Sequence, residues 1–154
     1  MAEKEYLLGN KAKDLLVYTT TVTSNTNLFP KRVRFTYSND LVMTAKGILK
    51  NIHSANECIF ATEYAHRLAL LKEVIDDCNY MLKIIEICVE LEYIDLRRCE
   101  HWSKLVLDIK YMTMSWRRKD SERAAALISA AEAQKREQEK ALIREIMQEV
   151  LHNK

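Results

Sequence analysis

The chain has 154 residues and a net charge of +2, and it contains only two glycines and one proline. This length suits one domain with a substantial core, and so few turn-forming residues favour few, long elements. A glycine-rich phosphate loop cannot be built from two glycines, and no run of about 18 apolar residues is present to cross a membrane. A nearly neutral charge does not by itself demand an anionic partner.

The first expected element is a helix that follows a short lead-in, residues 1–9. Asn10 has the side chain of an N-cap. The β-branched run from Thr19 to Thr23 weakens helix propensity, but the chain offers no second strand to pair with it. We therefore expect a helix that ends at the turn residues 24–27. Its inward positions are Ala12, Leu15, Leu16, Val22 and Tyr18.

A structured connection, LFPKRVRF, is expected over residues 28–35, because Pro30 disfavours helix at Phe29. A second helix then runs from about Tyr37 to Cys58. Gly47 lies inside it at a cost of about 1 kcal/mol relative to alanine, and we interpret this glycine as the mark of a close helix crossing. The inward positions recur every three or four residues: Leu41, Ala45, Ile48, Leu49, Ile52, Ala55 and Ile59.

The central helix is expected over residues 61–93, because apolar residues recur there at alternating steps of three and four. Two adjacent seams result, which together are wider than the single stripe of a helix on a bundle surface. This helix should therefore contact two or more neighbours. One seam is Leu68, Leu71, Ile75, Cys78, Leu82, Ile85 and Val89, and the other is Leu70, Val74, Met81, Ile84, Cys88 and Leu91.

A fourth helix should begin after Asp95, which is suited to cap it. Short loops between long helices make them antiparallel neighbours. We therefore predict an all-α fold, an antiparallel up-down four-helix bundle over residues 1–119. The inward positions of the fourth helix are Cys99, Trp102, Leu105, Ile109, Met112 and Trp116.

Residues 120–154 form a second region, an amphipathic C-terminal helical arm rich in Ala, Glu, Gln and Lys. Either Ser121 caps a new helix or the fourth helix continues. The arm is too thinly apolar to be bundle core, so we expect it to bind a sister subunit or a different protein; the alternative is a frayed, solvated helix. The predicted partner-binding residues are Leu142, Ile143, Ile146, Met147 and Val150.

No catalytic constellation, metal site or cofactor motif is predicted. Glu63 and His66 have the Glu-x-x-His spacing of di-iron bundles, which need that motif twice, and it occurs once here. A carboxylate and histidine metal site is therefore only an alternative hypothesis. The cysteines show no CxxC pair, which favours buried, reduced thiols in a cytoplasmic protein. They are Cys58, Cys78, Cys88 and Cys99.

Three clusters of positive charge remain as candidate nucleic-acid-binding residues, since guanidinium groups pair well with phosphate oxygens. We expect the first loop and the C-terminal end of the fourth helix to share one end of the bundle and to form one patch. The second cluster is expected at the opposite end. The alternative is ordinary solvated charge that complements a helix C-terminus. The clusters are Lys31, Arg32 and Arg34; Arg97 and Arg98; and Arg117, Arg118 and Lys119.

The order of these features resembles small four-helix-bundle proteins, over about residues 10–119. The FPK-x-x-RF pattern from Phe29 to Phe35 and the SWRRK sequence from Ser115 to Lys119 are most similar to the accessory variability determinant (Avd) proteins of diversity-generating retroelements. The proteins encoded by intervening sequences of 23S ribosomal RNA genes are a related group. The arm after Asp120 departs from the compact family pattern.

The Avd resemblance implies a non-catalytic protein that assembles as a basic, barrel-shaped homopentamer. It also implies binding to the reverse transcriptase and its template RNA in support of mutagenic cDNA synthesis, with the cDNA as a further candidate ligand. The resemblance to the intervening-sequence proteins implies instead a bundle whose biochemical role is obscure.

Overall fold

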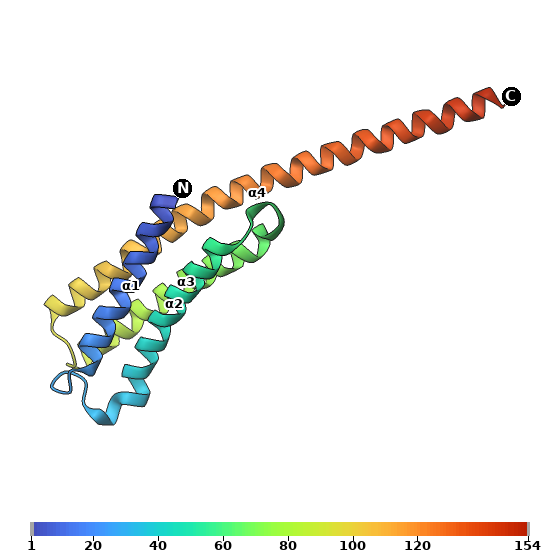
Figure 1. Cartoon of the computed structure of the whole chain (residues 1–154). Coiled ribbons are helices and arrows are strands. Elements are labelled where there is room, and N and C mark those ends of the chain that lie inside the picture. Colours follow the sequence, from blue (N-terminus) through green and yellow to red (C-terminus); the bar gives the residue numbers. More distant parts are fainter. Residues whose placement is uncertain (1, 154) are drawn as a thin grey trace. The chain divides into compact units, whose positions relative to one another are not determined.

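The structure is a computed structural model that describes the backbone of residues 2–153 and the side chains of residues 7–153. It confirms the all-α expectation, since the described residues form helices and no strands (Figure 1). None of these helices is long and apolar enough to cross a membrane. The elements are α1 (Ala2–Ser24), η1 (Lys31–Val33), η2 (Arg34–Ser38), α2 (Asn39–Glu57), α3 (Phe60–Glu90) and α4 (Leu96–His152).

The internal contacts of the chain divide it into two units, one that ends at Arg118 and one that spans Lys119–Lys154. Helix α4 runs without a break through Asp120 and Ser121. The fourth helix therefore continues into the arm, and Ser121 caps no new helix. That residues 1–119 and 120–154 behave as separate domains stays a prediction.

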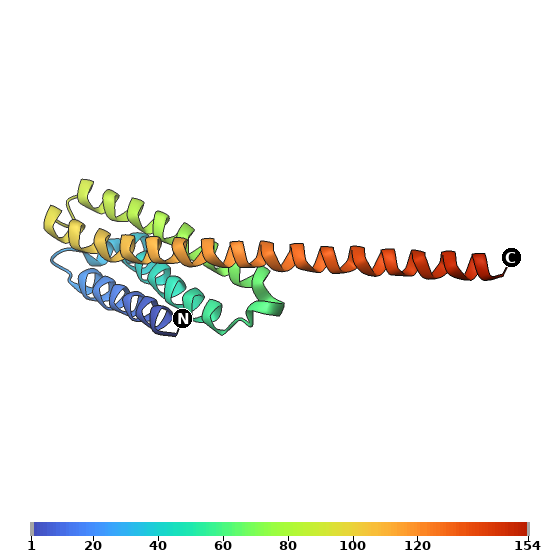
Figure 2. The same cartoon turned by 90° about the horizontal axis from the view of Figure 1, so that it is seen from above.

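In the first unit, α1, α2, α3 and the part of α4 up to Arg118 lie side by side and alternate in direction (Figures 1 and 2). One end holds the α1–α2 and α3–α4 connections, residues 25–38 and 91–95, and is called the loop end here. The ring of Phe29 in the first connection lies 5.6 Å from that of Tyr93 in the second. The α2–α3 connection at Cys58 and Ile59 lies at the opposite end.

Helix α1 differs from the expectation at its start. It begins at Ala2, so residues 2–9 are helical and Asn10 lies inside the helix rather than capping it. Leu8 is buried and precedes Ala12 and Leu15 at steps of four and three, so the apolar stripe extends the helix toward the N-terminus.

The threonine run is helical, as predicted. The hydroxyls of Thr21 and Thr23 donate to the carbonyls of Val17 and Thr19 at 2.8 and 2.7 Å. These bonds to the preceding turn satisfy the polar side chains within the helix. Thr19, which the apolar pattern had not selected, is fully buried.

The buried residues of α3 form one stripe between the two predicted seams, and successive members of the stripe belong to the first and the second seam in turn. The flanking seam positions are mostly half-buried, which confirms a wide contacting face. Ile59 was expected inward but is 64% exposed, because α2 ends at Glu57. A Cβ on Gly47 would lie 3.4 Å from Asp77 Oδ2, so the close approach is to a side chain of α3. The buried stripe of α3 is Leu71, Val74, Cys78, Met81, Ile85 and Cys88.

Candidate nucleic-acid interface

The first cationic cluster lies on η1 and η2 at the loop end. Phe29 and Val33 are buried at 2% and 8% exposure and anchor this segment on the bundle. The Val33 N–H donates to Pro30 O at 3.0 Å, which closes the first tight turn. Because the apolar anchors face inward, the cations between and after them face solvent. The exposed cations are Lys31, Arg32 and Arg34.

The second cluster is placed by the turn between α3 and α4. Tyr93 N–H donates to Cys88 O and Glu92 N–H to Val89 O, both at 2.9 Å. This is the Schellman pattern of a helix C-terminus. Its left-handed position is occupied by Glu92, with φ of 63°. The turn reverses the chain so that α4 begins at the loop end.

Asp95 caps α4, as predicted, and its Oδ1 accepts the Arg98 backbone N–H at 2.8 Å. The Arg98 guanidinium also contacts Asp95 Oδ2 at 2.7 Å. The backbone hydrogen bond from Arg98, with help from the charges of Arg98 and Arg97, lowers the pKa of Asp95. Arg98 is therefore already paired with a carboxylate. Arg97 is exposed and, within the described residues, forms no ion pair.

The structure corrects the predicted grouping of the clusters. Arg97 and Arg98 follow the α3–α4 turn and so share the loop end with the first cluster. Arg117 lies at the opposite end, where its Nε donates to Leu68 O, near the start of α3, at 3.2 Å. The reason is topological, because the fourth helix of an up-down bundle ends where the first begins. The predicted six-cation patch, Lys31, Arg32, Arg34, Arg117, Arg118 and Lys119, is therefore not formed.

Arg117 and Arg118 differ in their surroundings. Arg117 is half-buried, and its bond to the Leu68 carbonyl ties α4 to α3. Arg118 is exposed. Lys119, which follows them in the chain, is the first residue of the second unit. The structural contact gives Arg117 a role in packing in addition to any binding.

Sequence reasoning missed Arg67, which is only 4% exposed. Its guanidinium carbon lies 4.8 Å from the centre of the Trp116 ring and 5.8 Å from that of Phe60. These are cation–π distances. The signal was available, since Arg67 stands four residues before Leu71 and continues the buried stripe of α3.

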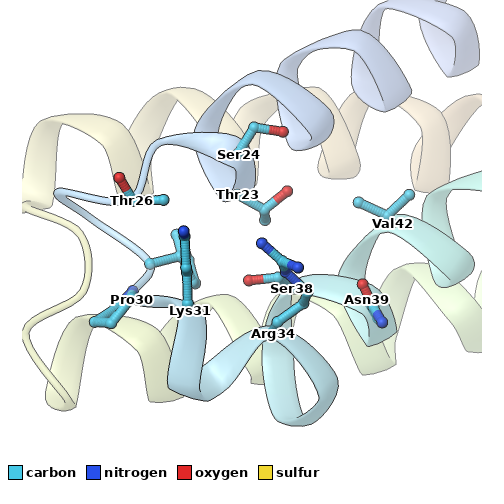
Figure 3. Close-up of a pocket in the computed structure, with 10 residues that line it drawn as sticks. Thr23, Ser24, Thr26, Pro30, Lys31, Arg34, Ser38, Asn39 and Val42 are labelled. Carbon is cyan, nitrogen blue, oxygen red and sulfur yellow. The ribbon is translucent and has the colours of Figure 1, made fainter.

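Two further features of the loop end were also missed. A cavity of about 310 Å³ lies between the end of α1 and the η1–η2 segment, and Lys31 and Arg34 line it together with several serine and threonine residues (Figure 3). Phe35, the next residue, is 84% exposed. Sites for single-stranded nucleic acid combine exposed aromatic rings with arginine and lysine. From the sequence alone, an apolar ring such as Phe35 is assigned to the core.

The metal alternative does not fit the geometry of its residues. Glu63 and His66 are both exposed, and Glu63 Oε1 accepts the Ile59 backbone N–H at 3.3 Å. Glu63 therefore caps the start of α3 rather than facing the bundle interior. Within the part of the chain that the structure describes, no three His, Cys, Asp or Glu residues are grouped as metal ligands.

The predicted partner-binding residues all lie in the second unit, where every side chain from Ala125 to Asn153 is exposed. The apolar residues form a face along the last turns of α4, with exposed fractions between 51% and 59%. Their binding to a partner stays a prediction. They are Leu142, Ile143, Ile146, Met147 and Val150.

Comparison with known proteins shows the fold. No family model matches the sequence, and no curated protein matches it. One similar solved structure is a protein of unknown function from the S23 ribosomal protein family of Bacteroides thetaiotaomicron. The TM-score is 0.66 at 17% identity, and the match covers 75% of this chain and 98% of the other. At this identity the likeness concerns the bundle alone.

Proposed function

We propose that the protein is a non-catalytic, homo-oligomeric accessory protein of a diversity-generating retroelement, which binds template RNA and the reverse transcriptase. The observation that carries the RNA-binding part is the loop end. It gathers cations that are far apart in sequence: Lys31, Arg32 and Arg34 from the first connection, and Arg97 and Arg98 from the first turn of α4. Of these five, only Arg98 is paired with a carboxylate within the described residues.

Oligomerisation would make this end a stronger RNA-binding surface. A single copy offers few cations, and its net charge is only +2. A homopentamer of the kind implied by the Avd resemblance repeats the loop end around a ring. Repeated weak contacts on one RNA strand raise the overall affinity through effective concentration. The exposed apolar face of the arm is available for the contact with the polymerase or with a sister subunit.

RNA binding is tested with the full chain and a labelled single-stranded RNA over a range of salt concentrations. We expect the affinity to fall steeply with salt, because phosphate contacts release counterions. Capture of the neighbouring reverse transcriptase from a co-expression lysate tests the partner. Salt-independent binding, or no RNA binding together with no capture, would exclude this function.

A second candidate function is that of the 23S ribosomal RNA intervening-sequence bundles. The S23-family structure favours it, since its fold matches at a TM-score of 0.66. Gene position separates the two proposals. A gene beside a reverse transcriptase and a pair of repeats supports the retroelement function, whereas a gene inside a 23S ribosomal RNA locus supports the second.

A further inference from the structure

The cavity at the loop end has the shape and charge of a phosphate site. Lys31 and Arg34 extend from η1 and η2 toward the last turn of α1, where Thr23 and Ser24 lie (Figure 3). The two cationic groups thus face the same space of about 310 Å³. That volume accommodates a phosphate group with its hydration water, since one water occupies about 30 Å³ in the liquid.

The charge in this cavity is not neutralised by the protein. Among residues 7–153, no carboxylate pairs with Lys31 or Arg34. The C-terminus of α1 contributes a partial negative charge of about half an elementary charge. Two full positive charges outweigh it, so the cavity keeps a net positive charge of more than one. An anion is therefore the ligand that the electrostatics favour.

Neutral hydrogen-bond donors complete the site. The Thr23 hydroxyl already donates to Thr19 O at 2.7 Å, so it can only accept. Ser24, Thr26 and Ser38 also line the cavity, and none of their hydroxyls makes a side-chain hydrogen bond within the described side chains. Ser38 is 8% exposed. These hydroxyls can donate to phosphate oxygens, as serine and threonine commonly do in nucleic-acid interfaces.

Phe35 supplies an independent observation. It follows Arg34 directly and is 84% exposed, more than any other large apolar side chain described. Leaving a whole phenylalanine ring in water is unfavourable by about 1.5–3 kcal/mol relative to burial. Its Cα lies about 3.8 Å from that of Arg34, so a strand that places a phosphate beside Arg34 brings an adjoining base within reach of the ring.

We propose that the loop-end cavity binds one phosphate of a single-stranded RNA through Lys31 and Arg34, and that Phe35 stacks on a neighbouring base. This inference deepens the proposed function and rests on its RNA-binding part. We expect this site to bind single-stranded RNA of any sequence, because phosphate contacts carry no information about the base and every base has a face for stacking.

The test uses the full chain and a labelled oligouridine of about ten nucleotides. We expect the Lys31→Gln/Arg34→Gln variant to lose affinity at least about tenfold and to reduce the salt slope by about 0.7, the value for one phosphate of a single strand. The matched control, Lys13→Gln/Lys50→Gln, removes the same charge from two exposed lysines in the middles of α1 and α2. It should change both values little. Equal losses in the two variants would overturn the assignment of the cavity.

The stacking step has its own variants. Phe35→Ala should weaken oligouridine binding about fivefold or more, while Phe35→Trp should preserve it. Ile59→Ala is the control, since Ile59 is also exposed but lies at the opposite end. If Phe35→Ala binds as well as the unchanged protein, the ring is not a stacking platform. All these side chains are exposed, so circular dichroism should show unchanged folding.

A competition experiment distinguishes a phosphate of an RNA strand from a free phosphate or a mononucleotide. Inorganic phosphate and uridine monophosphate should displace the oligouridine only at concentrations far above its dissociation constant. Tight binding of either small molecule without binding of the oligouridine would overturn the strand assignment. Oligouridine binding that survives Lys31→Gln/Arg34→Gln would overturn this inference and leave the proposed function standing. Absence of any RNA binding would overturn this inference and the RNA-binding part of the proposed function.

Discussion

The indole Nε1 of Trp102 donates a 3.0 Å hydrogen bond to the hydroxyl of Thr19, and both residues are fully buried. The bond joins α4 to α1 across 83 positions in the sequence. The ring of Tyr18 packs edge-on against Trp102 at 5.9 Å, and that of Phe29 does so at 6.3 Å. One polar contact inside an aromatic cluster therefore fixes how two helices meet just below the loop end.

Thr19→Val tests this bond. Valine keeps the shape but leaves the buried indole N–H without an acceptor, so we expect a loss of about 1–3 kcal/mol in the free energy of unfolding. Thr19→Ser keeps the hydroxyl and removes one methyl group, at about 0.8 kcal/mol. Urea unfolding followed by circular dichroism measures both. A valine variant as stable as the serine variant would show that the bond contributes little.

Glu92→Gly should stabilise the protein. Glu92 holds the left-handed position of the Schellman turn with φ of 63° and is exposed. A side chain there costs about 1–2 kcal/mol relative to glycine, partly offset by the greater freedom of glycine in the unfolded chain. We expect a net gain of about 1 kcal/mol in thermal or urea unfolding. Glu86→Gly, at an exposed position inside α3, is the control and should destabilise.

The two arginines at the start of α4 should differ in their effect on RNA binding. Arg97 is exposed without an ion pair in the described structure, whereas Arg98 is held by Asp95. Arg97→Gln should therefore weaken binding of a short RNA more than Arg98→Gln. Arg118→Gln, at the opposite end, should have the smallest effect on an RNA too short to span the bundle. Fluorescence anisotropy at fixed salt ranks the three. A larger effect of Arg118 would place the interface at the other end.

Two buried thiols should make the free energy of unfolding decrease as the pH rises in alkaline solution. Burial raises the pKa of Cys78 and of Cys88 to about 12 from an ordinary value of about 9. The unfolded chain then loses these protons at lower pH than the folded one, so stability is fully present below pH 9 and declines as pH rises toward 12. Urea midpoints at pH 8 and pH 10 should differ more for the natural chain than for Cys78→Ala/Cys88→Ala. An equal difference would mean that other groups cause the decline.

The apolar face of the arm is tested by charge. Ile146→Glu/Val150→Glu places two carboxylates on side chains that are 51% and 57% exposed. The free energy of unfolding should change by less than about 0.5 kcal/mol. The mass of the native complex, or the amount of reverse transcriptase recovered with the protein, should fall. Gln138→Glu/Gln148→Glu adds the same charge to exposed positions of the same helix outside that apolar set and should leave both unchanged. Identical behaviour of the two variants would exclude the predicted partner contact.

Helical periodicity and the scarcity of glycine and proline were sufficient to predict four helices, their antiparallel order and most of the core. The Asp95 cap and the helical threonine run were also predictable, because each depends on neighbours in sequence. The start of α1 was not, since it depends on the burial of Leu8. Arg67 was missed although it continues the spacing of the buried α3 stripe, because an arginine is expected in solvent until its aromatic partners are known.

The sequence by itself determined which residues are cationic, which are apolar and how many helices they form, because these depend on composition and on spacing along the chain. Only the tertiary structure decided which cations meet. Helix direction brings Arg97 and Arg98 to the loop end and sends Arg117 away. The cavity beside Lys31 and Arg34 and the exposed ring of Phe35 also exist only in three dimensions, because they are set by how η1 and η2 pack against the end of α1.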